Sequence, residues 1–169
     1  MLSQLEHWLN KFSDGCGKLA SVLFILMLFN VFYDVVARYL FNEVSIGMQE
    51  MEWHLFATTF LIATPYALKA EGHVRVDFIY ENLSVRGKAL IDLFGTLILL
   101  LPFALLVAWF GLDFSYQSFE LGEGSGDPGG LPYRWIIKAM IPLSFFAIAL
   151  SGVAIVLRSI RLLRRGAEA

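Results

Sequence analysis

The chain has 169 residues, of which 57% are apolar and 17% are charged, and its formal net charge is −2. Soluble domains are about 45–50% apolar, and a chain this short cannot hide the excess in its own core, which points to a lipid environment. The small net charge gives no electrostatic reason to expect nucleic acid, and the single cysteine, Cys16, excludes an intrachain disulfide or a cysteine zinc cluster.

The N-terminal residues predict a short amphipathic helix on the membrane surface. Its apolar side chains recur at helical spacing: Leu2, Leu5, Leu9 and Phe12. Such a pattern is typical of a helix that lies in the interface, although a disordered terminus is the alternative. Asp14, Gly15 and Gly17 predict a break before the next helix.

Four apolar segments are long enough to cross a bilayer as helices. Their ranges are 19–41, 46–68, 89–112 and 135–157. A spanning helix needs about 20 apolar residues, and helices satisfy their own backbone hydrogen bonds in lipid. The prolines inside these segments indicate kinks. The sequence therefore predicts an all-α membrane protein of four transmembrane helices, with residues 1–169 forming a single membrane domain.

The loops predict the orientation. The middle loop, 69–88, and the C-terminal tail are rich in Lys and Arg, whereas the loops at 42–45 and 115–131 contain neither. Basic residues are retained on the cytoplasmic side. We therefore expect both termini and the middle loop inside, and the other two loops outside.

The middle loop mixes apolar and charged residues, which favours a cytoplasmic interfacial segment between the second and third helices. Within it, Gly72, His73 and Asp77 are candidates for a structural clamp, in which the histidine and the carboxylate tie the loop to helix ends. Plain solvent exposure is the alternative. Ser84 is placed to cap the third helix.

Charged residues near the outer ends of the helices form a second candidate site. They are Asp34, Arg38, Glu50, Glu52, Arg134 and Lys138. Charges at this depth are costly and need partners. Asp34 and Arg38 are four residues apart and can pair along one helix face. We expect Arg134 and Lys138 to meet Glu50 or Glu52 across helices; the alternative is that all of them reach the interface unpaired. A structural or partner-facing role is favoured over a catalytic one.

No catalytic or cofactor motif is evident, so neither an enzyme nor a bound cofactor or metal is predicted. Two other functions stay open. Glu50 or Glu52 could relay protons in a stand-alone small transporter. A redox-enzyme membrane anchor would need histidine ligands for haem at membrane depth, and only His54 lies inside a predicted span.

Three segments resemble one known family. Residues 49–54 open the second helix with an acidic stretch, residues 72–77 read G-H-V-R-V-D, and residues 130–135 lead into the fourth helix. Together, and in this order, they resemble the small membrane subunits of tripartite ATP-independent periplasmic (TRAP) transporters, the DctQ family. The long glycine-rich outer loop departs from the usual pattern and leaves the partner contact there open.

The resemblance implies an accessory role. In such systems a periplasmic binding protein delivers a substrate, often an organic acid, to a membrane pair in the bacterial inner membrane. The large (M) permease subunit carries the substrate and sodium sites. The small subunit is expected to brace the large one and to contribute to docking of the binding protein, without binding substrate itself.

Overall fold

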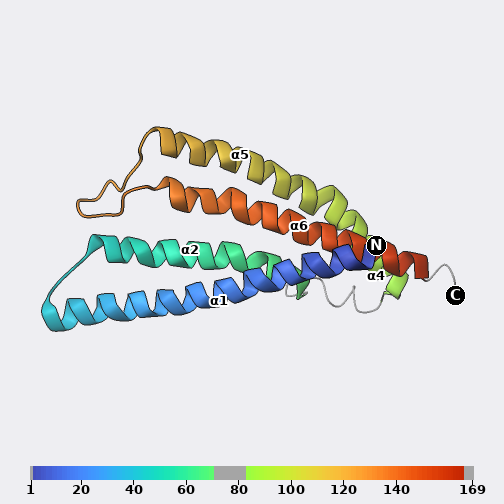
Figure 1. Cartoon of the computed structure of the whole chain (residues 1–169), viewed down its shortest axis with the longest axis horizontal. Coiled ribbons are helices and arrows are strands. Elements are labelled where there is room, and N and C mark those ends of the chain that lie inside the picture. Colours follow the sequence, from blue (N-terminus) through green and yellow to red (C-terminus); the bar gives the residue numbers. More distant parts are fainter. Residues whose placement is uncertain (1, 71–82, 166–169) are drawn as a thin grey trace.

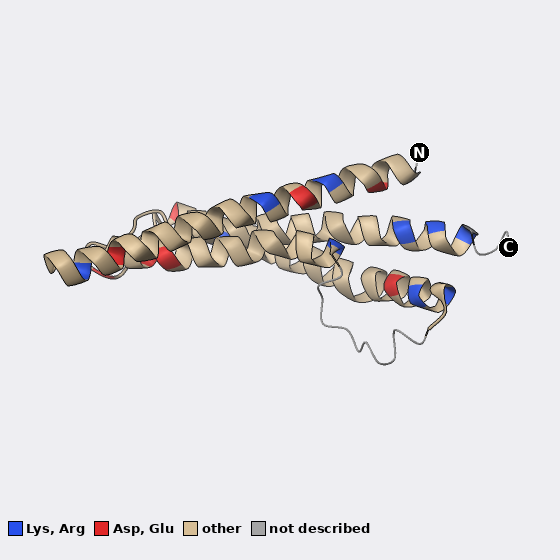
Figure 2. Cartoon of the chain, turned by 90° about the horizontal axis from the view of Figure 1, so that it is seen from below, with Lys and Arg blue, Asp and Glu red and all other residues tan. Residues whose placement is uncertain are grey.

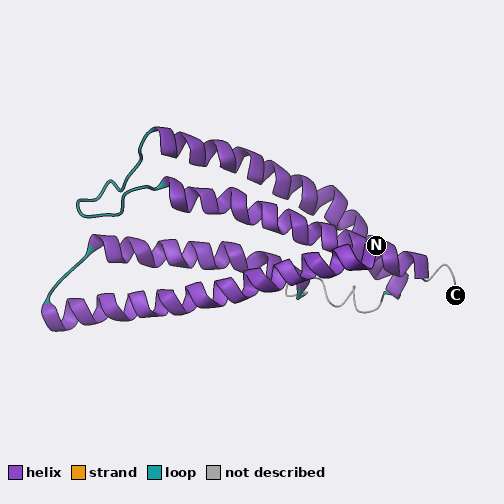
Figure 3. Ribbon diagram, viewed as in Figure 1, coloured by secondary structure: helices purple, strands orange, loops and turns teal. Residues whose placement is uncertain are grey.

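The computed structural model describes residues 2–70 and 83–165, and the regular structure in those stretches is entirely helical (Figure 3). In chain order the elements are α1 (Leu2–Phe41), α2 (Ile46–Lys69), α4 (Val85–Gly95), the π-helix η1 (Thr96–Leu100), α5 (Leu101–Glu120) and α6 (Trp135–Arg165). The predicted all-α class is confirmed for this part of the chain.

Two serines begin helices by capping them. The Ser45 hydroxyl accepts a hydrogen bond from the Met48 backbone N–H at 3.3 Å, at the start of α2. The Ser84 hydroxyl accepts one from the Gly87 N–H at 3.2 Å, at the start of α4. Each bond satisfies an N–H that has no partner inside its helix. The predicted cap at Ser84 is thus confirmed.

The helices lie side by side in the order α1, α2, α6 and α5, so that α2 and α6 are the inner two (Figure 1). α1 packs against α2, α2 against α6, and α6 against α5 (Figure 1). α6 also contacts α1, α4 and η1. Small residues let helix axes approach closely, and α6 buries several of them: Ser144, Ala149, Ser151, Gly152 and Ala154. Large apolar side chains such as Phe29 and Phe60 stay exposed along the layer, as suits a lipid or protein environment.

Within the described residues, three helical segments are long and apolar enough to cross a membrane. They are Ser3–Phe41, Val85–Glu120 and Trp135–Arg164. α2 is not among them, because its sequence includes Glu50, Glu52, His54 and Lys69. Its 24 residues would still extend about 36 Å, more than the hydrocarbon thickness of about 30 Å. Four predicted spans thus correspond to helices, and the crossing by α2 stays a prediction.

The N-terminal segment differs from the prediction. α1 is 40 residues long and runs unbroken through Asp14, Gly15 and Gly17, so no separate surface helix precedes the first span. Contacts with α2 explain why two of these residues, Asp14 and Gly17, do not break the helix. The Lys69 ammonium donates to the Asp14 carboxylate at 2.5 Å. A Cβ at Gly17 would lie 2.7 Å from the Cγ of Tyr66, so this glycine permits close packing.

The prolines are accommodated in two ways. Pro65 and Pro142 lie inside α2 and α6, which continue through them. Pro102 instead follows η1, where the Leu101 N–H donates to the Thr96 carbonyl five residues back. A proline ring clashes with the carbonyl four residues before it, and a wider turn relieves that clash. The predicted third span lies within the helical run 85–120, but its π-helical turn was not predicted.

The structure expected for the middle loop stays a prediction. The expected interfacial segment, with Gly72, His73 and Asp77, lies outside the described residues.

Candidate functional site at the outer end

One end of the row carries the turn at 42–45 and the loop at 121–134, and we call it the outer end, following the predicted orientation. The opposite end, with the N-terminus and the last turns of α6, is the inner end. Charged residues gather toward these two ends (Figure 2). The predicted charged layer belongs to the outer end.

Asp34 and Arg38 form the predicted pair on α1. The Arg38 guanidinium donates to the Asp34 carboxylate one turn away, and Asp34 is only 4% exposed. One turn deeper, the Asn30 side-chain amide donates to the Met48 carbonyl at 2.9 Å and ties α1 to α2. These contacts satisfy polar groups that would otherwise be costly beside lipid.

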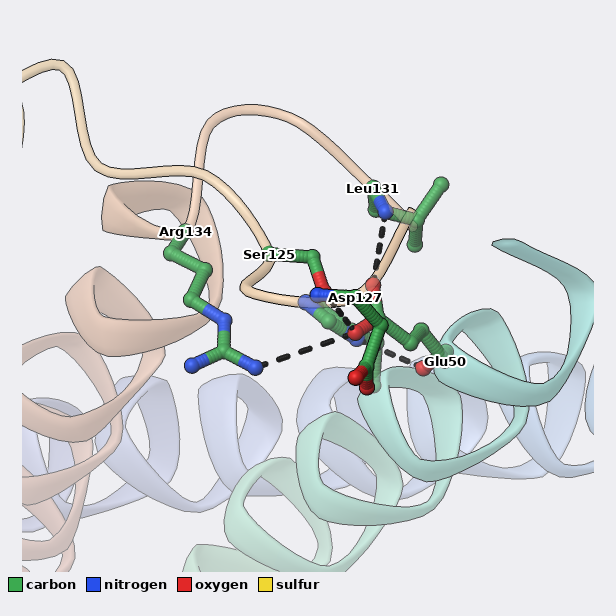
Figure 4. A network of polar contacts seen from close by, with 6 residues as sticks. Glu50, Ser125, Asp127, Leu131 and Arg134 are labelled. Atoms are coloured by element: carbon green, nitrogen blue, oxygen red, sulfur yellow. Dashed lines mark hydrogen bonds and ion pairs between the residues drawn. The ribbon is translucent and has the colours of Figure 1, made fainter. Parts of the chain in front are cut away.

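Glu50 binds the outer loop to α2. It is 6% exposed, and its carboxylate accepts hydrogen bonds from the Ser125 hydroxyl and from the Leu131 backbone N–H, the latter at 2.6 Å (Figure 4). Arg134 Nη2 lies 3.7 Å from Glu50 Oε1. Of the partners considered for Arg134, Glu50 is therefore the one that it meets. The two loop contacts were not predicted, because they depend on how the loop folds.

The loop is shaped to reach this carboxylate. The Ser125 N–H donates to the Leu131 carbonyl at 3.0 Å, and the Arg134 N–H donates to the Glu123 carbonyl at 2.9 Å. A Cβ at Gly130 would lie 2.9 Å from Glu50 Oε2. A glycine there lets the backbone approach the carboxylate closely, which no larger residue allows without displacement.

Lys138 pairs differently from the prediction. Its ammonium donates to the Glu123 carboxylate in the loop, not to Glu50 or Glu52, and lies 4.3 Å from the centre of the Phe114 ring. The hydrogen bond from Lys138 is the main cause that lowers the pKa of Glu123 below its ordinary value. Glu123 was missed because most of the loop and the first three residues of α6 separate the two charges.

Glu52 points into a different region of the outer end. It lines a groove of 510 Å³ between α1 and α2 together with Arg38 and Trp53. The two acidic residues at the start of α2 therefore have separate surroundings. The candidate site therefore has two parts: the buried Glu50 carboxylate that binds the loop, and a groove beside Glu52.

The inner end has contacts that the sequence did not suggest. Arg161 Nη2 donates to Glu6 Oε1 at 2.8 Å, and the hydroxyls of Ser13 and Ser151 are 2.8 Å apart; both contacts join α1 to α6. Together with the pair of Asp14 and Lys69, they fasten the N-terminal half of α1 to its neighbours.

The contacts at these two ends are suited to holding the helices and the loop in place. No group of three His, Cys, Asp or Glu side chains suited to a metal ion occurs in the stretches 2–70 and 83–165. At the outer end, the Glu50 carboxylate accepts from a hydroxyl and a backbone N–H and faces a guanidinium. Such a network orders a loop and fixes its position on the helices.

The fold and these contacts define a helical membrane protein. Several of its charged side chains join the helices and the outer loop to one another. The family described as "Tripartite ATP-independent periplasmic transporters, DctQ component" matches residues 8–162, and the chain belongs to this family. A Haemophilus influenzae protein with the provisional name TRAP transporter small permease protein is 26% identical over 149 residues, which are 88% of this chain and 90% of that protein. No solved structure matches the chain.

The family resemblance inferred from the three sequence segments is thus confirmed. The chain is a small permease component of the TRAP transporter family, which is a family of transport proteins and not of catalytic enzymes.

Proposed function

We propose that this chain braces the large permease subunit of a TRAP transporter as a single domain of the bacterial inner membrane. The observation that carries the proposal is the row of helices with exposed apolar side chains along it. So few helices cannot cover their own apolar surface, so lipid and a larger membrane partner complete it. The brace widens the footprint of the large subunit in the bilayer.

The proposed topology has four crossings, with α2 as the second, and both termini in the cytoplasm. α2 packs along α1 and α6, which are long and apolar enough to span. Neighbours on both sides reduce the lipid exposure of its polar residues, and Glu50 is satisfied by the loop. The distribution of Lys and Arg supports the orientation.

The outer loop is the proposed contribution to docking of the periplasmic binding protein. Glu50 and Lys138 fix the loop on the helices, so docking would not have to order it first. Exposed acidic residues in and beside the loop, Glu43, Glu120 and Asp127, offer charges for a soluble partner. Sodium coupling and uptake of an organic acid complete the proposal, and both belong to the large subunit.

Reconstitution tests the role. The chain is co-expressed with a large TRAP permease subunit, purified through a tag on the large subunit, and reconstituted into proteoliposomes with a binding protein and a sodium gradient. We expect both membrane proteins to co-purify and uptake to require both. A large subunit that transports at an unchanged rate without this chain contradicts the proposal.

A further inference from the structure

Two largely apolar cavities lie along α6, between α2 and the helical run 85–120. The cavity in the outer half has a volume of 520 Å³ and is lined in part by Phe56, Phe60, Leu61, Phe114, Ile137 and Ile141. The cavity in the inner half has a volume of 540 Å³ and is lined in part by Leu68, Leu100, Phe103 and Ile155. Each cavity therefore takes side chains from the same three parts of the row: α2, α6 and the helical run 85–120.

Helical spacing places the two cavities on one face of the row. Along α5, Phe103 and Phe114 are 11 residues apart, which is about three turns. Along α6, Ile141 and Ile155 are 14 residues apart, or about four turns. Leu61 and Leu68 of α2 are seven apart, or about two turns. Each helix presents one face to both cavities, and we call the two cavities together, with the strip of α6 between them, the α6 trough.

Side chains of α6 at the base, or floor, of the trough are recessed, and side chains of α2 and α5 along its two sides, or walls, are exposed. On the floor, Ile137 of α6 is 9% exposed. On the walls, Phe60 of α2 is 68% exposed and Phe103 of α5 is 61% exposed. From Ile137 to Ile155 the floor covers 18 residues, or about 27 Å, close to the hydrocarbon thickness of about 30 Å. An occupant of the whole trough therefore spans both leaflets, which a transmembrane helix does and one lipid acyl chain does not.

The outer mouth of the trough carries an arginine with unused donors. Arg134 lines the outer cavity, and its Nε is buried without a hydrogen-bond partner among the described residues. Its Nη2 is 3.7 Å from Glu50, which is beyond hydrogen-bond range. Buried donors of this kind are normally satisfied, and a carboxylate is the acceptor that matches a guanidinium best.

We infer that the α6 trough receives one transmembrane helix of the large permease subunit, with an acidic side chain at its outer end that accepts hydrogen bonds from Arg134. This inference rests on the proposed bracing role and adds the face that performs it. The phenylalanine walls hold the helix on both sides, and the isoleucine floor packs against its ridges. The acidic side chain fixes its depth.

Photo-crosslinking in the co-expressed complex tests the surface. The photoreactive residue p-benzoylphenylalanine replaces Phe60 or Phe103 in the trough, or Phe29 on α1 as the control. Phe29 and Phe60 are equally exposed, each at 68%, so the pair differs in location and not in accessibility. We expect crosslinks to the large subunit from both trough positions, severalfold above the Phe29 yield, with the crosslinked peptides in one transmembrane helix.

The crosslinking results distinguish failure of the α6 trough as the contact surface from failure of the bracing role. A complex that purifies intact but crosslinks no better from Phe60 than from Phe29 overturns the trough and leaves the bracing role standing. Crosslinks from the trough to phospholipid only, or to two different helices of the large subunit, also overturn it. Failure of the two proteins to co-purify removes the bracing role and the trough together.

Substitutions of Arg134 test whether an acidic side chain of the large subunit binds at the outer end of the trough. Arg134→Gln keeps a polar side chain but removes the charge, and we expect roughly tenfold weaker assembly, the effect of about 1.4 kcal/mol. Arg134→Lys keeps the positive charge, and assembly stronger than that of Arg134→Gln would support an acidic partner. Assembly unchanged in Arg134→Gln, with Phe60 crosslinks intact, would overturn the acidic partner.

Discussion

The inner and outer ends of the molecule are held in different ways. At the inner end, three separate contacts join α1 to its neighbours: Glu6 with Arg161, Ser13 with Ser151, and Asp14 with Lys69. At the outer end, one buried carboxylate, that of Glu50, takes two hydrogen bonds from the loop that links α5 to α6. Three pairs share the work at the inner end, whereas the outer loop is held mainly by the buried Glu50 carboxylate, with the pair of Lys138 and Glu123 beside it. Single substitutions should therefore act more strongly outside than inside.

The largest effect is expected from Glu50→Ala. It leaves the Leu131 N–H and the Ser125 hydroxyl without their acceptor and frees the loop from α2. We expect a thermal midpoint lowered by several degrees in detergent and rapid protease cleavage within 121–134. Glu52→Ala, which leaves both hydrogen bonds in place, is the control. Equal protease resistance of the two variants would show that Glu50 does not hold the loop.

Arg134→Glu comes next. The reversed charge faces Glu50 and removes the guanidinium beside it, so it should weaken both the loop and assembly with the large subunit. Arg164→Glu, an exposed position on α6 near the inner end, is the matched control and should leave assembly nearly unchanged. Co-purification yield measures the difference. Similar, small effects of both reversals would argue against a partner-facing role for the outer layer.

A smaller effect is expected at the inner end. Glu6→Ala removes one of three contacts, and the free energy of unfolding should fall by about 1 kcal/mol, at the upper end for a partly exposed pair. Exchanging the charges, with Glu6→Arg and Arg161→Glu in one chain, should recover most of that loss. Denaturation of the two variants in detergent measures it. If the exchanged chain is as unstable as the two single reversals combined, the pair is not a stabilising contact.

The smallest effect is a dependence on pH. The pKa of Glu123 is lowered by the hydrogen bond from Lys138, so this contact stabilises the loop above the ordinary glutamate pKa. The contribution is lost as the pH falls through the lowered pKa. Protease sensitivity of the loop, followed from neutral to acidic pH, should rise only below the ordinary range for glutamate. In Lys138→Gln the loop should be more sensitive already at neutral pH. A profile identical in both chains would contradict the pairing.

Contacts within one helix could be predicted from the sequence, and those that depend on chain folding could not. The helical segments follow from runs of apolar residues, and the pair of Asp34 and Arg38 follows from a spacing of four. The contact of Arg134 with Glu50 was foreseen because a charge near lipid needs a partner. Lys138 pairs with Glu123 instead, since the folded loop brings that residue closer.

The unbroken α1 shows the limit of local signals. Asp14 and Gly17 are residues that often end helices, yet in α1 they contact Lys69 and Tyr66 of α2. Tertiary contacts outweighed local preference. The contacts of Glu6 and Ser13 with α6 link residues more than 130 positions apart, and no spacing rule relates them.

α1 has 40 residues in one helix, and its length is about 60 Å, twice the hydrocarbon thickness. If α1 crosses the bilayer as proposed, a helix of that length extends well beyond one membrane surface. Because the N-terminal half of α1 is joined to α2 and α6, we expect a tilt imposed near Asp34 to shift these inner contacts as well. A fluorophore at the N-terminus would therefore register movements that occur on the far side of the bilayer.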